Sequence, residues 1–131
     1  MQIHHIIPKK IIEVLQNPDV KNELLCNNDF LIELPCSEQE AKNRKLYLFH
    51  NGPHDNYTNQ ILELLGNNLN GNIDYYRNFA SKILNCINYH LAHSDNGKPT
   101  NINDIVVEEM SESELEDYND DSVHTSDRDL F

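Results

Sequence analysis

His50-Asn51-Gly52-Pro53-His54-Asp55-Asn56-Tyr57 marks a change from extended chain to helix near the middle of this sequence. Gly52-Pro53 interrupts any helix through both histidines, because proline lacks the N–H that a helix interior needs. We therefore expect His50 to end the apolar run before it and His54 to open a helix that has Pro53 at its first position. The apolar side chains that follow recur at helical spacing, and Gly66 suits a C-terminal cap.

Short apolar runs and amphipathic segments alternate on both sides of this stretch. Residues 29–34 and 46–49 are expected to form short strands that could pair as a small hairpin-like core, with the polar residues 37–45 as a long connecting loop. Helices are expected after Pro8, over residues 20–25 and, as one long helix, over residues 74–93. The pattern predicts a helix-rich α+β domain.

The net charge of −12 is concentrated at one end of the 131-residue chain. Residues 1–107 hold 9 Lys/Arg and 12 Asp/Glu, whereas residues 108–131 hold one Arg and 10 Asp/Glu. We expect one domain over residues 1–107 and an acidic, disordered tail over residues 108–131. The tail is expected to be a solvated segment; the alternative is that it mimics nucleic acid and covers the active site. The overall acidity therefore does not exclude a nucleic-acid substrate.

Several classes of protein are disfavoured by the composition. No stretch approaches the roughly 20 apolar residues of a membrane span, and no signal peptide is visible at the start. The three cysteines form no CxxC pattern, and their odd number indicates free thiols in a reducing compartment. They are Cys26, Cys36 and Cys86, of which Cys86 is expected in the core.

Four of the seven histidines form two pairs, His4-His5 and His50 with His54. Phosphodiester hydrolysis needs a base and a cation, and neutral imidazole can act as the base or bind the metal. Neighbours on an extended segment point to opposite sides, so one of His4 and His5 can hold a metal while the other approaches the substrate. Either pair alone is weak support, since such pairs also occur by accident. Both pairs in one small domain favour a metal-dependent hydrolase.

The remaining histidines have simpler explanations. His90 and His93 lie at helical spacing near the end of the long helix, where histidine complements the helix dipole. We expect both to be structural. His124 lies in the acidic tail and is expected to be incidental.

Three blocks together resemble a known family: residues 4–8 (HHIIP), 30–35 (FLIELP) and 50–57 (HNGPHDNY). They are similar to the AHH-type nucleases of the HNH/endonuclease VII (His-Me finger) superfamily, which occur as toxin domains of bacterial polymorphic toxins. The resemblance covers about residues 3–69. It implies a ββα-metal (HNH-like) finger with additional helices, and a divalent-metal-dependent endonuclease.

The resemblance also implies roles for individual residues. His4 matches a metal ligand and His5 the general base that activates water, while His54 and His50 match the remaining ligands. Tyr57 matches a family tyrosine whose role is structural or phosphate-contacting. One divalent cation is implied, Mg²⁺ first, with Zn²⁺ or another transition metal as the alternative. The products would carry a 5′-phosphate and a 3′-hydroxyl.

Two departures from the family pattern stand beside these matches. Ile3 replaces a small residue, and Phe30 stands where the family has an Asn that braces the loop of the base. Either Asn28 takes over that support, or catalysis is weakened or lost. Basic residues near the motifs are candidates for phosphate contacts, and DNA is favoured over RNA by analogy. These residues are Lys9, Lys10, Arg44 and Lys45.

The biological role that the resemblance implies is a secreted or injected bacterial effector domain that acts in the target-cell cytoplasm and is neutralised by a cognate immunity protein. Two other classes of function stay open at this point. One is a catalytically degenerate HNH-like binding module. The other is a structural zinc-binding domain, in which removal of the metal would unfold the protein.

Overall fold

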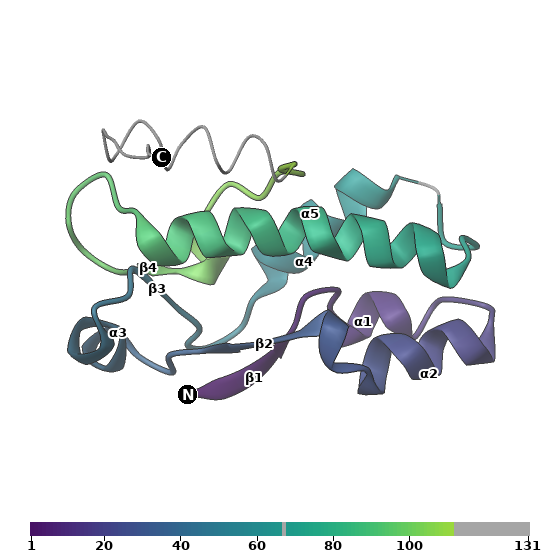
Figure 1. Ribbon diagram of the computed structural model, residues 1–131, viewed down its shortest axis with the longest axis horizontal. Helices are drawn as coiled ribbons and strands as arrows, with labels where there is room; N and C mark the ends of the chain where they lie inside the picture. Colours follow the sequence, from purple (N-terminus) through teal and green to yellow (C-terminus); the bar gives the residue numbers. More distant parts are fainter. Residues whose placement is uncertain (67, 112–131) are drawn as a thin grey trace, which may run out of the picture.

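The computed structural model describes residues 1–66 and 68–111, and over that range the chain is α+β and about half helical, as predicted. Figure 1 shows the long helix α5 running across the molecule, with β1, β2, α1 and α2 on one side and the last described residues on the other. The elements are, in order, β1 (Gln2–His5), α1 (Lys9–Ile12), α2 (Pro18–Cys26), the 3-10 turn η1 (Asn28–Phe30), β2 (Leu31–Leu34), α3 (Glu38–Arg44), β3 (Leu48–Phe49), α4 (Asp55–Leu65), α5 (Ile73–Ala92), β4 (Thr100–Asn101) and the 3-10 turn η2 (Ile102–Asp104).

The first sheet joins the N-terminal strand to the predicted strand over residues 29–34. β1 pairs with β2 antiparallel, and His4 lies opposite Ile32. The strand proper begins at Leu31, because Asn27 caps the 3-10 turn before it by accepting a hydrogen bond from the Asp29 N–H at 2.9 Å. Burial alternates along β1: His4 is only 3% exposed, whereas Ile3 is 63% exposed. The two adjacent histidines therefore point to opposite sides of the strand, as predicted, and His4 is the buried one.

The expected hairpin between residues 29–34 and 46–49 is wrong. Residues 48–49 form β3, which pairs in parallel with the distant strand β4. The polar residues between the two runs form helix α3 rather than a loop. Ser37 caps this helix by accepting a hydrogen bond from the Glu40 N–H at 3.1 Å, and Lys42 pairs with Glu38 one turn away. The helix carries the chain away from β2, so β3 finds another partner.

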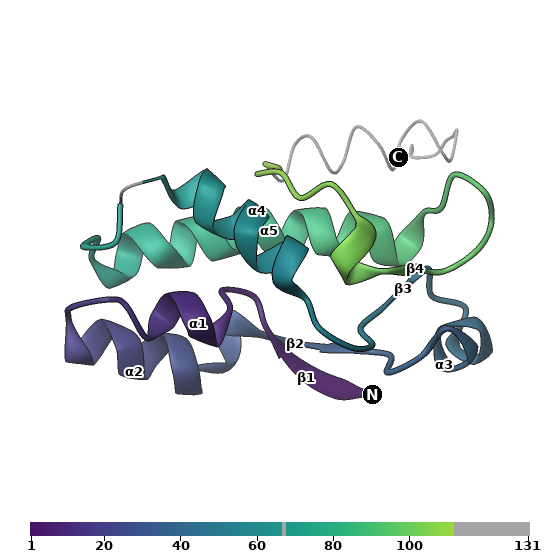
Figure 2. The ribbon, with the colours of Figure 1, turned by 180° about the vertical axis from the view of Figure 1, so that it is seen from behind.

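Helices α4 and α5 each turn an apolar face to the core. Figure 2 shows α4 rising from the β1–β2 sheet across α5. The helical spacing singles out eight apolar residues. Six of them are buried, namely Tyr57, Ile61 and Leu65 on α4 and Phe79, Ile83 and Ile87 on α5, whereas Leu64 and Leu91 are half-buried. Cys86 is buried as well, as expected. Gly66 ends α4 with a positive φ of 61°, as its predicted capping role requires. Pro53 is not in the helix: His54 is the N-cap, and α4 begins at Asp55.

The segment after α5 returns along the helices. Met110 is buried, its N–H donates to the Lys82 carbonyl, and its own carbonyl accepts a hydrogen bond from Asn85 Nδ2 at 2.9 Å. The first residues of the predicted acidic tail thus pack on α5, while residues 112–131 lie outside the described part of the chain. No helix in the described ranges is long and apolar enough to cross a membrane.

Candidate metal centre

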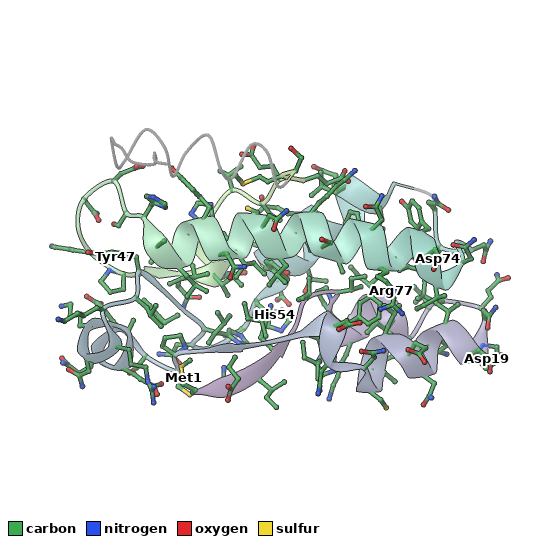
Figure 3. The ribbon with its side chains drawn as sticks, viewed as in Figure 1. Met1, Asp19, Tyr47, His54, Asp74 and Arg77 are labelled. Carbon is green, nitrogen blue, oxygen red and sulfur yellow. The ribbon has the colours of Figure 1, made fainter. Side chains whose placement is uncertain are left out.

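Three histidines from separate elements meet in the middle of the molecule. His4 comes from β1, His50 follows β3, and His54 caps α4. Each offers one ring nitrogen, and these nitrogens all lie within 4.8 Å of one another. Figure 3 places His54 centrally, between the strands and α5. The group is close enough to hold a metal ion, as expected for these three residues.

Two of the three rings carry a buried nitrogen that no described residue satisfies. His4 Nε2 and His50 Nε2 are buried without a hydrogen-bond partner among the described residues. An unsatisfied buried polar atom costs about 1–3 kcal/mol, so native structures rarely keep one without a reason. A metal ion coordinated by both nitrogens would remove that cost. The residues therefore fit a bound cation.

The opposite edges of two of the rings are held by neighbours. His54 Nδ1 lies 3.1 Å from Thr58 Oγ1, one helical turn further along α4. His50 Nδ1 lies 2.9 Å from the side-chain amide of Gln2. Gln2 Nε2 also donates to the His50 carbonyl at 3.2 Å. Coordination through His50 Nε2 requires a proton on Nδ1, and the Gln2 amide then keeps only this backbone hydrogen bond. Outer contacts of this kind orient ligand rings, and sequence reasoning missed both Gln2 and Thr58.

Burial favours the neutral form of His4 and His50. It lowers the pKa of His4 to about 3, and the neighbouring rings of His50 and His54 add to the effect. Burial also lowers the pKa of His50, helped by His54. A metal ligand must be unprotonated, and His4 keeps its lone pair far below neutral pH.

The stability of the metal-free protein is expected to fall as the pH is lowered from about 6.5 towards 3. In that window the unfolded chain protonates His4 and the folded chain does not, so protons favour unfolding. The slope from this residue alone is at most about 1.4 kcal/mol per pH unit. Urea unfolding in the presence of a chelator measures it, and a His4→Leu variant should show a shallower slope. An equal slope would contradict the assignment.

The centre opens into a cleft of about 560 Å³. Lys9 and Lys10 line this cleft together with His5, in agreement with their expected place near the site. Lys10 Nζ is 3.6 Å from Asp55, an exposed pair that a phosphate can displace. The other two candidate phosphate contacts, Arg44 and Lys45, do not line it. Arg44 pairs with Glu40 within α3, and Lys45 ends that helix in the left-handed conformation.

His5 faces this cleft from the other side of β1. Its Nε2 lies 3.4 Å from the Leu25 carbonyl oxygen, which can only accept a hydrogen bond. His5 therefore donates from Nε2 and keeps its lone pair on Nδ1. Burial lowers its pKa, so that the ring is neutral at pH 7. A neutral imidazole held in one tautomer is what a general base requires.

No family model, curated protein or solved structure matches this chain. The centre combines three imidazoles whose nitrogens lie close together with a fourth imidazole and two lysines that line the same cleft.

The loop after His5 is supported by residues other than the expected Asn28. The Ile6 N–H donates to the Phe30 carbonyl at 3.0 Å, and the Tyr57 hydroxyl donates to the Ile6 carbonyl at 2.6 Å. Asn28 lies exposed in η1, and no hydrogen bond among the described residues joins its side chain to this loop. Phe30, which occupies the place of the family Asn, thus contributes through its backbone.

Tyr57 is completely buried, and burial raises the pKa of its hydroxyl. Its ring packs edge-on against His4, with the centroids 5.0 Å apart. Of the two roles expected for Tyr57, phosphate contact is wrong, because the side chain has no exposed surface. The structural role agrees with these contacts.

A Tyr57→Phe variant is expected to lose about 1–3 kcal/mol of stability, because the Ile6 carbonyl would lose its partner. Metal affinity should change little, because the phenyl ring can keep its contact with His4. Urea unfolding and calorimetric metal titration measure the two quantities. Unchanged stability would contradict the bracing role.

The predicted structural histidines lie outside the centre. His93 follows α5, its ring stacks on Tyr89 with centroids 4.5 Å apart, and its Nδ1 lies 2.9 Å from the Tyr89 carbonyl. Burial lowers the pKa of His90. Neither belongs to the group of ring nitrogens that could hold a metal within the described chain. His124 lies outside the described residues.

Proposed function

We propose that the chain is a divalent-metal-dependent endonuclease of the HNH kind, close to the AHH type, that hydrolyses phosphodiester bonds, with DNA favoured as substrate. The observation that carries the proposal is the juxtaposition of His5 with the three-histidine centre in one open cleft. The centre supplies a place for a cation, and His5 supplies a base that does not coordinate it.

The residues of the chain divide the work between them. His4, His50 and His54 would hold the cation, and a bound cation would supply positive charge to stabilise the scissile phosphate and the leaving oxygen. His5 Nδ1 removes a proton from the attacking water, while the Leu25 carbonyl keeps the proton on Nε2. Lys9 and Lys10 attract the phosphate backbone to the mouth of the cleft. The attack would leave a 5′-phosphate and a 3′-hydroxyl.

The finer fold that we propose is a ββα-metal finger with additional helices. β1 and β2 would be its two strands and α4 its helix. The antiparallel pairing of β1 with β2 supports this, and so does the position of one ligand on the strand and another at the start of the helix.

The ligand set favours a transition metal, Zn²⁺ first, over the Mg²⁺ expected from the sequence. Imidazole nitrogens suit zinc, nickel, iron and copper, whereas Mg²⁺ prefers oxygen ligands and keeps much of its water. Three protein ligands in an open cleft leave a coordination position free, which is typical of catalytic rather than structural zinc. No fourth His, Cys, Asp or Glu of the described ranges joins the three.

The biological proposal rests on the family resemblance of residues 3–69. It is that the chain is an effector domain delivered to a target cell, where it acts in the cytoplasm. An immunity protein would then be its natural partner.

Plasmid nicking with added Zn²⁺, Ni²⁺, Mn²⁺ or Mg²⁺, and with EDTA as control, tests the proposed activity. The expected result is metal-dependent nicking with ligatable 5′-phosphate ends. A protein that binds metal without cleaving DNA or RNA would instead be a degenerate binding module. A chain that unfolds on chelation, followed by circular dichroism, would be a structural zinc domain.

A further inference from the structure

The first turn of α4 has no cap of its own. An N-cap side chain normally accepts hydrogen bonds from the second and third amides of the helix, which lack partners within it. His54 occupies that position, but its side chain makes no capping hydrogen bond. Its Nδ1 contacts Thr58 instead, and its ring belongs to the metal centre. The ligand role thus leaves the amides of Asn56 and Tyr57 without the usual acceptor.

A distant asparagine supplies the missing cap. Asn103 Oδ1 accepts hydrogen bonds from the Asn56 N–H at 2.8 Å and the Tyr57 N–H at 3.1 Å. In return, Asn56 Nδ2 donates to the Asn103 backbone carbonyl at 2.8 Å. These are the two amides that an N-cap would serve. Asn103 lies 47 residues after Asn56 in the sequence.

The segment that carries Asn103 is itself fixed, and it also holds the loop before α4. Ile102 is completely buried, and the Asn103 N–H donates to Asn101 Oδ1 at 3.1 Å. Asn101 Nδ2 donates to the carbonyl of Asn51 at 2.8 Å. Asn51 follows the ligand His50. Residues 101–103 therefore hold the chain on both sides of the Gly52-Pro53 turn, between the two ligands.

We infer that Asn103 is a positioning residue for the metal centre: it caps α4 in place of His54 and so frees the His54 ring for the cation. The inference rests on the three-histidine site of the proposed function, but not on nuclease activity. Asn103 lies outside residues 3–69, the stretch that resembles the nuclease family, so the inference extends the site beyond that stretch.

The test compares Asn103→Ala with Asn103→Asp and with Asn85→Ala. The first removes the acceptor, and the second keeps one that the helix N-terminus favours. Asn85→Ala is the matched control. Asn85 lies on α5 and its side-chain amide donates to the Met110 carbonyl, so this variant also removes an asparagine hydrogen bond that holds the segment after α5, but at a place away from the centre. The readouts are Zn²⁺ affinity by calorimetry, the visible spectrum of bound Co²⁺, and hydrogen exchange of the Asn56 and Tyr57 amides.

In Asn103→Ala these two amides are expected to exchange about tenfold faster, and Zn²⁺ to bind up to about tenfold more weakly. Asn103→Asp should restore both, and Asn85→Ala should change neither. Exchange and affinity equal to wild type in Asn103→Ala, or an equal loss in Asn85→Ala, would overturn the inference. A wild-type protein that binds neither Zn²⁺ nor Co²⁺ would overturn the metal centre itself. Binding without cleavage would overturn only the nuclease proposal.

Discussion

His5→Ala is expected to slow metal-dependent cleavage by about 10²- to 10⁴-fold, the usual contribution of a general base. Metal affinity should stay within a few-fold of wild type, because His5 is not among the three ligands. The fold should also be retained. His5 is only half-buried, and its ring hydrogen bond is a long one, 3.4 Å to the Leu25 carbonyl. The separation of a large rate effect from a small binding effect is what distinguishes a base from a ligand.

The matched control for His5 is His93→Ala. His93 is also half-buried and also has one ring nitrogen on a backbone carbonyl, that of Tyr89. It lies outside the cleft, so its removal should leave cleavage unchanged. Single-turnover nicking rates measured at saturating metal compare the two variants. Wild-type rates in His5→Ala would show that another group activates the water.

The second large effect is expected from His4→Leu, which should abolish metal binding and cleavage while stabilising the metal-free protein. Leucine is close to histidine in size and has no polar atom to leave unsatisfied, whereas His4 Nε2 is buried without a partner among the described residues. Removing that cost, about 1–3 kcal/mol, should outweigh the altered packing against Tyr57. Metal-free His4→Leu should therefore melt a few degrees higher than metal-free wild type.

Thermal unfolding with and without Zn²⁺ tests both parts of this result. For wild type, metal at 100 times its Kd should add about 2.7 kcal/mol, or roughly 10 °C for a domain of this size. For His4→Leu the added metal should shift the melting temperature by less than about 1 °C. A metal-induced shift equal to that of wild type would exclude His4 as a ligand. A lower melting temperature without metal would show that the His4 ring stabilises the core on its own.

The parts of the site that could be predicted are those with a local signal. Gly52-Pro53 separates strand from helix, because proline lacks the N–H that a helix interior needs. Alternation along an extended segment predicts that His4 and His5 point to opposite sides, but not which of them is buried. The periodicity of α4 and α5 is likewise a property of the segments themselves. The ligand group followed from these local features together with the family resemblance.

What could not be predicted depends on partners far apart in the sequence. The apolar run at 46–49 has the same appearance whether it pairs with β2 or, as it does, with β4. The polar stretch over 38–44 is capped by Ser37 and has an ion pair between Glu38 and Lys42. It lacks the apolar stripe from which a helix is usually predicted. Nothing near Asn103 in the sequence indicates that its side chain caps a helix that begins 48 positions earlier, at Asp55.

The parallel pairing of β3 with β4 has a consequence for synthesis. All three histidines of the candidate centre have been translated once His54 is made, but the strand and the asparagines that hold their loops come more than 40 residues later. Domains fold as their sequence emerges from the ribosome. The loops that carry the three histidines are therefore expected to become fixed only after residues 100–103 have emerged. A nascent chain that ends before these residues therefore contains the three histidines but lacks the strand and the asparagines that position them.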